Sequence, residues 1–275
     1  MLGLSEQEIL EIGELAEAHA NADMIAAMPA SLAAALGVHD AWIGGAYALA
    51  VSELDGVLFN RVIGLGVTQP ATVAMLDRIR ALFTVAGTSA TIQLAPQARP
   101  AALADRLAAR GFAPTGAWAK FLRGPEPPPL APTDLRVKQI GPEHAAAAAR
   151  ICGDAFHLTP PVAAWLVAGV GRPGWHHYLA FAGDEPVAVA MLYVRDGIGW
   201  FGSAGTLPAY RGQGGQSALL ARRITDAAAA GCRWLVVETG EDTPQRPNPS
   251  YHNIVRAGFT RVYLRPNWRR LPRAE

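Results

Sequence analysis

Short apolar runs separated by turn residues dominate the second half of the chain. Residues 178–182 and 187–194 are apolar runs on either side of Gly183-Asp184-Glu185, which predicts two antiparallel strands joined by a tight turn. A second turn, Asp196-Gly197, leads into a further strand over 199–206. Three consecutive strands with short turns form a meander, and a meander followed by a strand–loop–helix unit indicates a mixed α+β fold.

Both halves of the chain follow one order of predicted elements: strand, helix, strand, helix, Gly-Phe and a last strand. In the first half these fall at 61–67, 71–86, 90–94, 101–110, Gly111-Phe112 and through Trp118 and Phe121. In the second half they fall at 199–206, 216–230, 233–238, 250–257, Gly258-Phe259 and through Val262 and Leu264. The repeat predicts a tandem duplication, and chance similarity between two α/β segments is the alternative.

A proline-rich run lies between the two halves. Prolines lack the amide donor that a helix or an interior strand needs, so segment 125–133 is predicted to be a stiff linker. The predicted domains are then 1–124 and 134–275, each of ordinary domain size. We expect each to be a mostly antiparallel twisted sheet flanked by helices in αβα layers.

Composition and charge exclude several classes of protein. Of the 275 residues, 51% are hydrophobic and 17% are charged, which indicates a folded globular protein. The net charge of +1 does not favour a nucleic-acid partner. The basic end of the chain, 265–273, is predicted to be a solvated tail.

The cysteines and the N-terminal pattern bear on the compartment. Cys152 and Cys232 are too few for a disulfide framework or a zinc site, so we expect no metal and a reducing compartment. Residues 5–20 predict an amphipathic helix with several glutamates. Without a basic and apolar leader or a run of 18 apolar residues, the chain is expected to have no membrane contact and to be cytoplasmic.

A glycine-rich loop precedes the helix predicted at 216–230. Gly212, Gly214 and Gly215 permit positive φ and remove side chains that would keep a ligand away. Successive amides in such a turn, together with a helix start, form an anion-binding nest, and Arg211 adds a full positive charge. The loop is predicted to bind a diphosphate, and a flexible strand-to-helix connection is the alternative.

Two other phosphate-binding patterns compete for this loop. A P-loop needs a lysine and then serine or threonine after its last glycine, but Gln216-Ser217 stands there. A dinucleotide fingerprint is closer, with Glu238 at the end of the next strand. That fold needs the glycines after the first strand of a parallel sheet, whereas here they follow a meander, so the topology excludes it.

The loop resembles the signature of the GCN5-related N-acetyltransferase (GNAT) superfamily, (Gln/Arg)-x-x-Gly-x-(Gly/Ala), which is usually seen as Pro-x-Tyr-Arg-Gly-x-Gly before a Leu-Leu helix. The matching segment is Pro208-Ala209-Tyr210-Arg211-Gly212-Gln213-Gly214-Gly215-Gln216-Ser217-Ala218-Leu219-Leu220. It departs from the family at Gln216, where a small residue is usual. The resemblance covers about 134–268. Residues 1–124 resemble the family only in the order of elements, because 68–72 has no glycine loop and no arginine, so this half resembles a degenerate copy.

The resemblance implies acetyl-CoA as co-substrate and a set of residues that bind it. Backbone amides of the loop would hold the pyrophosphate, the end of the preceding strand would pair with the pantetheine arm, and an asparagine near the last helix would contact the coenzyme from the other side. Gly202 and Gly205 suit a bulge that opens the cleft. The implied coenzyme-binding residues are Ala204, Gly205, Thr206, Arg211, Gly212, Gln213, Gly214, Gly215, Gln216, Ser217, Asn248 and Asn253.

Candidates for the base and the acid follow from the same region. Glu238 ends an apolar strand, where partial burial would raise its pKa, so it is the candidate base; binding the substrate ammonium or capping a helix are alternatives. By the resemblance, the acid is a tyrosine four residues before the Gly of Gly-Phe, and Ile254 stands there. Tyr251 is then the candidate acid, with His252 beside it, although a structural tyrosine is an equal alternative.

The resemblance therefore implies an N-acetyltransferase that acylates a primary amine, on a small molecule or an amino acid. The first half would complete the acceptor site or stabilise the active half. A non-catalytic acyl-CoA-binding or regulatory module is the alternative, favoured by Ile254 at the usual acid position. The oligomeric state stays open, with a homodimer as one option.

Overall fold

The computed structural model describes residues 3–271, and one continuous sheet runs through them. Its eleven strands lie in the order β1-β2-β3-β4-β11-β5-β10-β9-β8-β7-β6. The strands are β1 (Val38–Ile43), β2 (Ala46–Val51), β3 (Arg61–Ile63), β4 (Ala90–Gln93), β5 (Ala113–Arg123), β6 (Arg136–Ile140), β7 (Trp175–Ala182), β8 (Glu185–Arg195), β9 (Ile198–Thr206), β10 (Trp234–Gly240) and β11 (Thr260–Arg270). The helices are α1 (Glu6–Ala26), α2 (Ala30–Leu36), α3 (Val73–Ala86), α4 (Leu103–Ala108), α5 (Ala145–Phe156), α6 (Pro160–Leu166), α7 (Gly215–Ala229) and α8 (Pro249–Arg256).

The sheet repeats one topology in its two halves. In the first half β1, β2 and β3 are antiparallel neighbours, and β3 pairs with β4 in parallel across α3. In the second half β7, β8 and β9 are antiparallel neighbours, and β9 pairs with β10 in parallel across α7. The mixed α+β architecture and the predicted meander are confirmed, and the repeat is a repeat of structure.

The last strand of each half lies in the sheet of the other half. Strand β5, from the first half, pairs with β10, with Phe121 opposite Val237. Strand β11, from the second half, pairs with β4, with Trp268 opposite Ile92. The two exchanged strands also pair with each other at the centre of the sheet. Each half of the chain therefore completes the other, which the linear order of elements did not predict.

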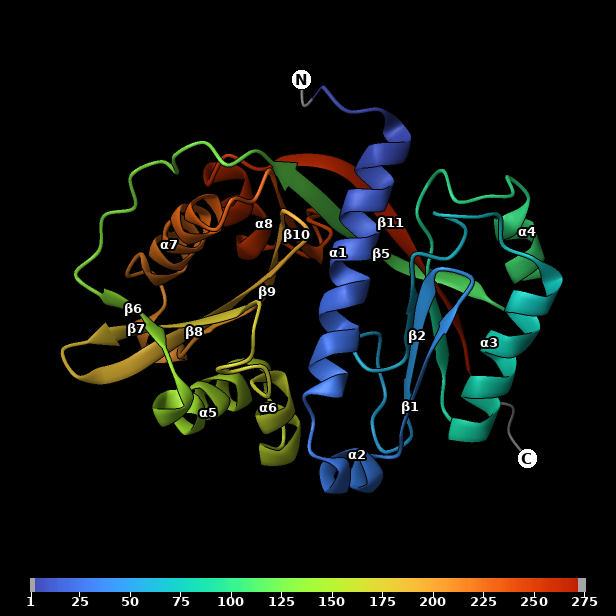
Figure 1. Cartoon of the computed structure of the whole chain (residues 1–275), viewed down its shortest axis with the longest axis horizontal. Coiled ribbons are helices and arrows are strands. Elements are labelled where there is room, and N and C mark those ends of the chain that lie inside the picture. Colours follow the sequence, from blue (N-terminus) through green and yellow to red (C-terminus); the bar gives the residue numbers. More distant parts are fainter. Residues whose placement is uncertain (1–2, 272–275) are drawn as a thin grey trace.

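The segment between β5 and β6 has no regular secondary structure, as its prolines require. Figure 1 shows it as a long connection that runs around the outside of the C-terminal half. Leu130 within it is almost fully exposed. The segment connects the exchanged strand to the second meander, while the contact between the halves is made by the sheet itself.

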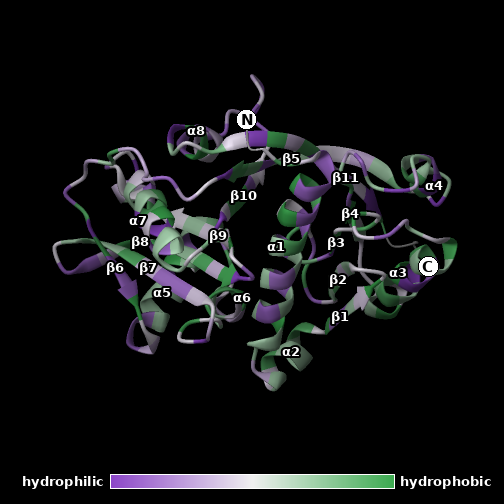
Figure 2. Cartoon of the chain, turned by 45° about the horizontal axis from the view of Figure 1, so that its top comes forward, coloured by the Kyte–Doolittle hydropathy of each residue, from purple (hydrophilic) through white to green (hydrophobic). Residues whose placement is uncertain are grey.

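Helix α1 lies at the centre of the molecule, between the two halves (Figure 1). Ser5 and Glu8 form a reciprocal capping box at its start. Its buried face combines apolar and charged residues, and Figure 2 shows hydrophilic bands along it. The residues of that face recur with helical spacing: Leu10, Glu14, Glu17, Asn21 and Met24. The glutamates at 14 and 17 are therefore inside the protein, where charges need partners.

The basic end of the chain is not a solvated tail, and this prediction was wrong for the residues that the structure describes. Arg265 is fully buried in β11 and its Nη1 lies 2.9 Å from Glu14 and 2.7 Å from Glu17. Arg269 lies 2.7 Å from Asp55. These arginines are charge partners of the first half, and Arg273 lies outside the described residues.

Two further predictions concern the cysteines and the membrane. Cys152 and Cys232 are both buried with free thiols. Across residues 3–271 the structure has no helix with the length and apolar character needed to cross a bilayer.

Candidate functional site

Strands β9 and β10 separate part of the way along their length. They pair from Ile198 and Trp234 to Phe201 and Val237, and no further. At that point β9 carries a bulge, in which two residues, Gly202 and Ser203, oppose Met191 of β8. The predicted bulge is thus present, and beyond it β9 no longer pairs with β10 in the described part of the chain.

Glycines are required along this stretch of β9 because neighbours fill the space of a side chain. A Cβ added at Gly202 would lie 2.5 Å from the Trp200 ring, and one at Gly205 would lie 2.6 Å from Ala155. The bare backbone therefore lines the opening between the strands, where a ligand can approach the chain closely.

The glycine loop forms an open cup of amides at the start of α7. Gly212 and Gly214 have φ of 80° and 81°, which favours glycine, and Gly214 is the N-cap without a side chain to close the helix. Ala218 is the first to donate its amide into the helix, 3.0 Å from the Gly214 carbonyl. Within residues 3–271 no acceptor pairs with the amides of 212–217. This is the arrangement that binds an anion.

A cavity of about 550 Å³ lies over this loop and the end of β9. The Nε of Arg211 donates to the Thr206 carbonyl at 3.3 Å, and Arg256 of α8 adds a second positive charge across the cavity. Most of the residues predicted to bind the coenzyme line it: Ala204, Gly205, Thr206, Arg211, Gly212, Gly214, Gly215, Gln216, Ser217 and Asn253.

Two of the predicted coenzyme-binding residues do not line this cavity. Asn248 is the N-cap of α8: its Oδ1 accepts from the amides of Ser250 and Tyr251, and its Nδ2 donates to Gly240 at 2.7 Å. Its polar atoms are thus committed within the protein. Gln213 is exposed, and its carbonyl accepts from Thr133 of the linker region at 2.6 Å. Only its backbone amide belongs to the cup.

A second cavity, of about 390 Å³, adjoins the first and extends between the two halves. Phe156, Ala204, Gln216 and Ser250 line both cavities, so the two meet at these residues. Its lining includes aromatic side chains, with Trp165 and Trp200 from the second half. The first half contributes Asn21, Met24, Leu58, Phe59, Arg61 and Trp118.

Glu238, the predicted base, lines this second cavity and is almost completely buried. Trp200 donates its Nε1 proton to the Glu238 carboxylate at 3.0 Å, and Lys120 Nζ lies 3.0 Å from Oε2. Burial, reinforced by the negative charge of Glu17, raises the pKa of Glu238, while Lys120 opposes the rise. A carboxylate with a raised pKa at the wall of a cavity is suited to accept a proton.

Lys120 connects Glu238 to a buried network of charges under α1. Its ammonium also lies 2.6 Å from Glu17, which binds Arg61 at 3.0 Å and Arg265 at 2.7 Å. Burial opposes ionisation of Glu17, but the three cations outweigh it and hold its pKa below the usual range. With Glu14 included, three carboxylates face three cations, so the network is neutral as a whole.

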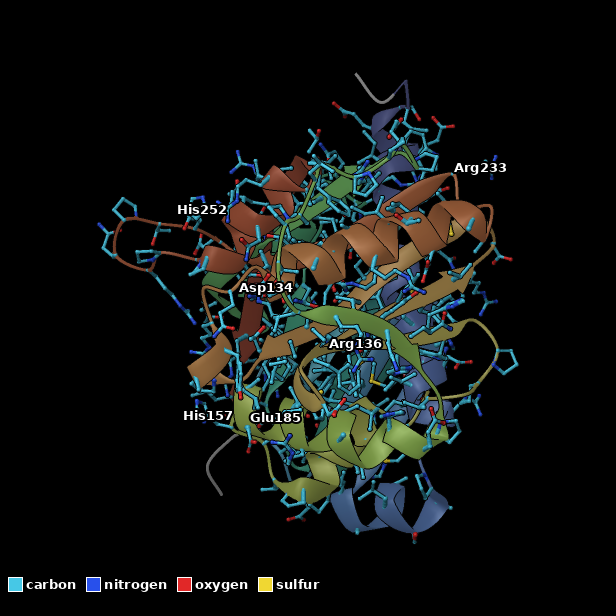
Figure 3. The ribbon with its side chains drawn as sticks, turned by 90° about the vertical axis from the view of Figure 1, so that its left-hand side faces the viewer. Asp134, Arg136, His157, Glu185, Arg233 and His252 are labelled. Atoms are coloured by element: carbon cyan, nitrogen blue, oxygen red, sulfur yellow. The ribbon has the colours of Figure 1, made fainter. Side chains whose placement is uncertain are left out.

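Tyr251, the predicted acid, is not brought to Glu238. Its ring packs edge-to-face on Phe121, with 5.0 Å between centroids, and it lines neither cavity. The wall of the second cavity at this turn of α8 is made by Ser250 and Ile254. His252 lies at the outer surface (Figure 3), 3.2 Å from Asp242. The geometry argues against either ring as the proton donor.

Several residues of the site were missed from the sequence. Trp118 lines the second cavity, and Lys120 contacts Glu238, only because β5 is exchanged into the second half. The burial of Glu17 could have been predicted, because helical spacing puts this carboxylate on the same apolar face of α1 as Leu10 and Met24. Nothing in the sequence distinguished Arg223 of α7 and Phe156 of α5 from other helix residues, so their place in the cavity wall could not be predicted.

Part of the second half is similar to a known protein family. Residues 147–247, which include the open loop and the splayed strands, match the model of the acetyltransferase (GNAT) family. A search of curated proteins found no match.

Solved structures extend the likeness to both halves. A GCN5-related N-acetyltransferase from Kribbella flavida matches with a TM-score of 0.65 and 20% identity, over 95% of this chain and 97% of that one. A GCN5-related N-acetyltransferase from Sphaerobacter thermophilus matches with 0.59 and 18%, over 83% and 81%. A tandem GNAT protein from the clavulanic acid biosynthesis pathway matches with 0.54 and 14%, over 84% and 83%. Nearly the whole chain thus shares the fold of these solved GNAT structures.

Proposed function

We propose that this protein is an N-acetyltransferase that moves an acetyl group from acetyl-CoA to a primary amine of a small molecule or an amino acid. The observation that carries the proposal is the cup of unpaired amides at 212–217, which opens through the splayed strands into a cavity that ends at Glu238.

The residues of the first cavity fit the parts of coenzyme A. The loop amides, with Arg211 and Arg256, offer donors and positive charge to the pyrophosphate. The edge of β9 at Ala204, beyond the last residues that pair with β10, offers backbone groups to the amides of the pantetheine arm. At the junction of the cavities, the buried Oε1 of Gln216 has no donor within the described residues. An amide N–H of the pantetheine would supply one.

Glu238 would act on the acceptor amine. Transfer joins the amine nitrogen to the acyl carbon and breaks the thioester C–S bond; one proton leaves the nitrogen and the departing thiolate takes one up. Glu238 accepts the proton from the nitrogen, since its raised pKa and its position at the cavity wall suit a base. Lys120 and Trp200 hold the carboxylate in place. The thiolate takes up its proton through water, and Glu238 then gives its proton back to water, so that no net charge is left behind.

The size and lining of the second cavity favour a small acceptor. A volume of about 390 Å³ lies in the range of small-molecule sites. Because α1, β3 and the exchanged β5 supply part of its wall, the first half completes the acceptor site. The buried free thiols of Cys152 and Cys232 suit a reducing cytoplasm, where we place the reaction.

The second candidate is a non-catalytic acyl-CoA-binding or regulatory module. It is favoured by the position of Tyr251, which lines neither cavity, and of Ile254 at the usual acid position. The experiment that separates the two measures acetyl-CoA binding by calorimetry and free thiol release with a panel of primary amines. Binding with turnover supports the enzyme and binding without turnover supports the module. If acetyl-CoA does not bind at millimolar concentration, both are wrong.

A further inference from the structure

Arg223 is a cation at the wall of the second cavity, and within residues 3–271 no carboxylate pairs with it. It extends from α7, is 1% exposed and lines the cavity wall. Its Nε donates to the Leu219 carbonyl at 3.2 Å, and its Nη1 donates to the carbonyls of Met191 at 2.9 Å and Gly202 at 3.3 Å. These carbonyls fix the guanidinium against the bulge of β9 without neutralising its charge.

The other buried cations around the cavity are neutralised. Arg61 pairs with Glu17, Lys120 with Glu17 and Glu238, and Arg265 with Glu14 and Glu17. Among residues 3–271 no carboxylate lies within ion-pair distance of Arg223. An unpaired buried charge is costly in a protein, so it is retained where it has a use.

The groups around Arg223 cannot provide the missing charge. Asp226, one turn further along α7, accepts from the Tyr178 hydroxyl of β7 at 2.8 Å and pairs with Arg222 at 2.9 Å. On the β9 side the guanidinium lies 4.8 Å from the centre of the Phe201 ring. Burial lowers the pKa of Arg223 to about 9, so it stays charged at neutral pH. Its Nη2 group donates no hydrogen bond in the described part of the chain.

We propose that Arg223 binds a carboxylate carried by one of the two substrates, so that this cavity selects a carboxylated acyl group or a carboxylated amine. This inference rests on the proposed function. Arg223 lies beneath the bulge of β9, beside the junction of the cavities, where the acyl group and the acceptor meet. A guanidinium in a site closed to bulk water forms strong, bidentate hydrogen bonds with a carboxylate.

Calorimetry with matched ligands separates the two sources of the carboxylate. The acyl arm compares succinyl-CoA with acetyl-CoA. The acceptor arm, at saturating CoA, compares amino acids with the amines that lack their carboxylate, such as phenylalanine and phenethylamine. In one arm the carboxylated ligand should bind about tenfold tighter or more, as expected for a charge-assisted hydrogen bond.

Variants of two neighbouring arginines complete the test. Arg223→Gln keeps hydrogen-bond donors for the carbonyls but removes the charge, so the affinity ratio of carboxylated to uncarboxylated ligand should fall to about one. Arg223→Lys keeps the charge and should retain part of the preference. Arg222→Gln, on the same helix but paired with Asp226 outside the cavity, is the matched control and should keep the preference. Thermal unfolding checks that each variant is folded.

Each outcome decides the inference. A wild-type protein that binds CoA but prefers the carboxylated ligand in neither arm overturns the role of Arg223 and leaves the proposed function standing. A preference that survives Arg223→Gln also overturns it. If the wild-type protein binds no CoA, the proposed function is wrong and this inference falls with it.

Discussion

The two halves of the chain build the same strand–turn–helix unit and finish it in opposite ways. In the second half the turn before α7 leaves its amides open, and Gly214 provides no side chain to cap the helix. In the first half Thr72 caps α3, accepting from the Met75 amide at 3.3 Å. The Ala71 amide before it donates to the Arg99 carbonyl at 2.8 Å. The turn before the first helix is therefore packed against the protein's own atoms, and one amide of the helix start, that of Met75, is capped by a side chain.

In the first copy the segment at Arg99 packs against the turn before α3, whereas in the second copy a cavity of about 550 Å³ lies over the turn before α7. Arg99 donates its amide to the Gly66 carbonyl at 2.9 Å and its Nη2 to the Val67 carbonyl at 2.9 Å, and Gln7 of α1 reaches the same carbonyl. A Cβ at Gly66 would lie 2.6 Å from the Arg99 carbonyl, so the packing is tight. The same topology thus gives an open turn in one copy and a packed turn in the other, depending on whether another segment of the chain lies against the turn before the helix.

The largest expected effect concerns the residue at the end of the open cavity. Glu238→Gln keeps the size of the side chain but removes the base, so turnover should fall by about 100- to 10,000-fold. Because only the ionised carboxylate accepts a proton, kcat/KM of the wild-type enzyme should fall as the pH drops below the raised pKa of Glu238. Initial rates of thiol release across pH measure both.

Trp118→Phe, which keeps an aromatic wall in the same cavity, is the control for packing changes. Turnover by Glu238→Gln equal to that of the wild type, with the same acidic limb of the pH profile, would remove Glu238 from the reaction.

The next effect concerns the open helix start. Arg211→Ala combined with Gly214→Val removes a charge and places a β-branched residue at φ of 81°, 2.8 Å from the Pro132 carbonyl. Acetyl-CoA affinity should fall by about 100-fold or more, because several charge-assisted bonds to the pyrophosphate are lost. The matched pair in the first copy, Gln69→Ala with Thr72→Val, should leave the affinity unchanged. Calorimetry with acetyl-CoA on both double variants is the measurement. Equal losses of affinity in the two would show that the two turns do not differ in ligand binding.

A third effect concerns the contact between the halves. Lys120→Met leaves Glu17 with one cation fewer and Glu238 with none, both in buried positions. Breaking a buried pair in this way should lower the free energy of unfolding by about 3–5 kcal/mol. The exposed pair of Arg80 and Asp77 provides the control, since Arg80→Met should change the free energy of unfolding by less than about 1 kcal/mol. Urea unfolding measures both, and equal small changes would mean that the buried network adds little to stability.

Local patterns predicted the parts of this molecule that depend on near neighbours. The meander, the repeated order of elements, the bulge at Gly202 and the glycine loop each follow from a few adjacent residues. The exchange of β5 and β11 does not, because either strand satisfies its hydrogen bonds equally well beside several partners. Lys120 could therefore not be placed next to Glu238 from the sequence.

The charged residues show the same limit. Arg265 was interpreted as part of a solvated tail because its neighbours in sequence are basic, yet its partners Glu14 and Glu17 are about 250 residues away. Asn248 was assigned to the coenzyme from a resemblance, whereas its local role as the cap of α8 accounts for its hydrogen bonds. Contacts between residues far apart in the sequence determine which charged side chains are buried. Burial then determines whether a charge is solvated or needs an ion-pair partner.

The smallest expected effect is also the most selective test of the comparison between the two helix starts. Thr72→Ala removes the side-chain cap of α3 and should lower the free energy of unfolding by about 1 kcal/mol, which corresponds to roughly 2–4 °C in Tm for a chain of this size. Acetyl-CoA affinity should not change, because no residue of α3 lines the cavity over the glycine loop. Thermal unfolding and calorimetry on one preparation measure both, with the exposed Thr84→Ala near the end of α3 as control. A variant that loses coenzyme affinity but not stability would show that the first copy still binds a ligand, so its closure by Arg99 would not be the difference between the halves.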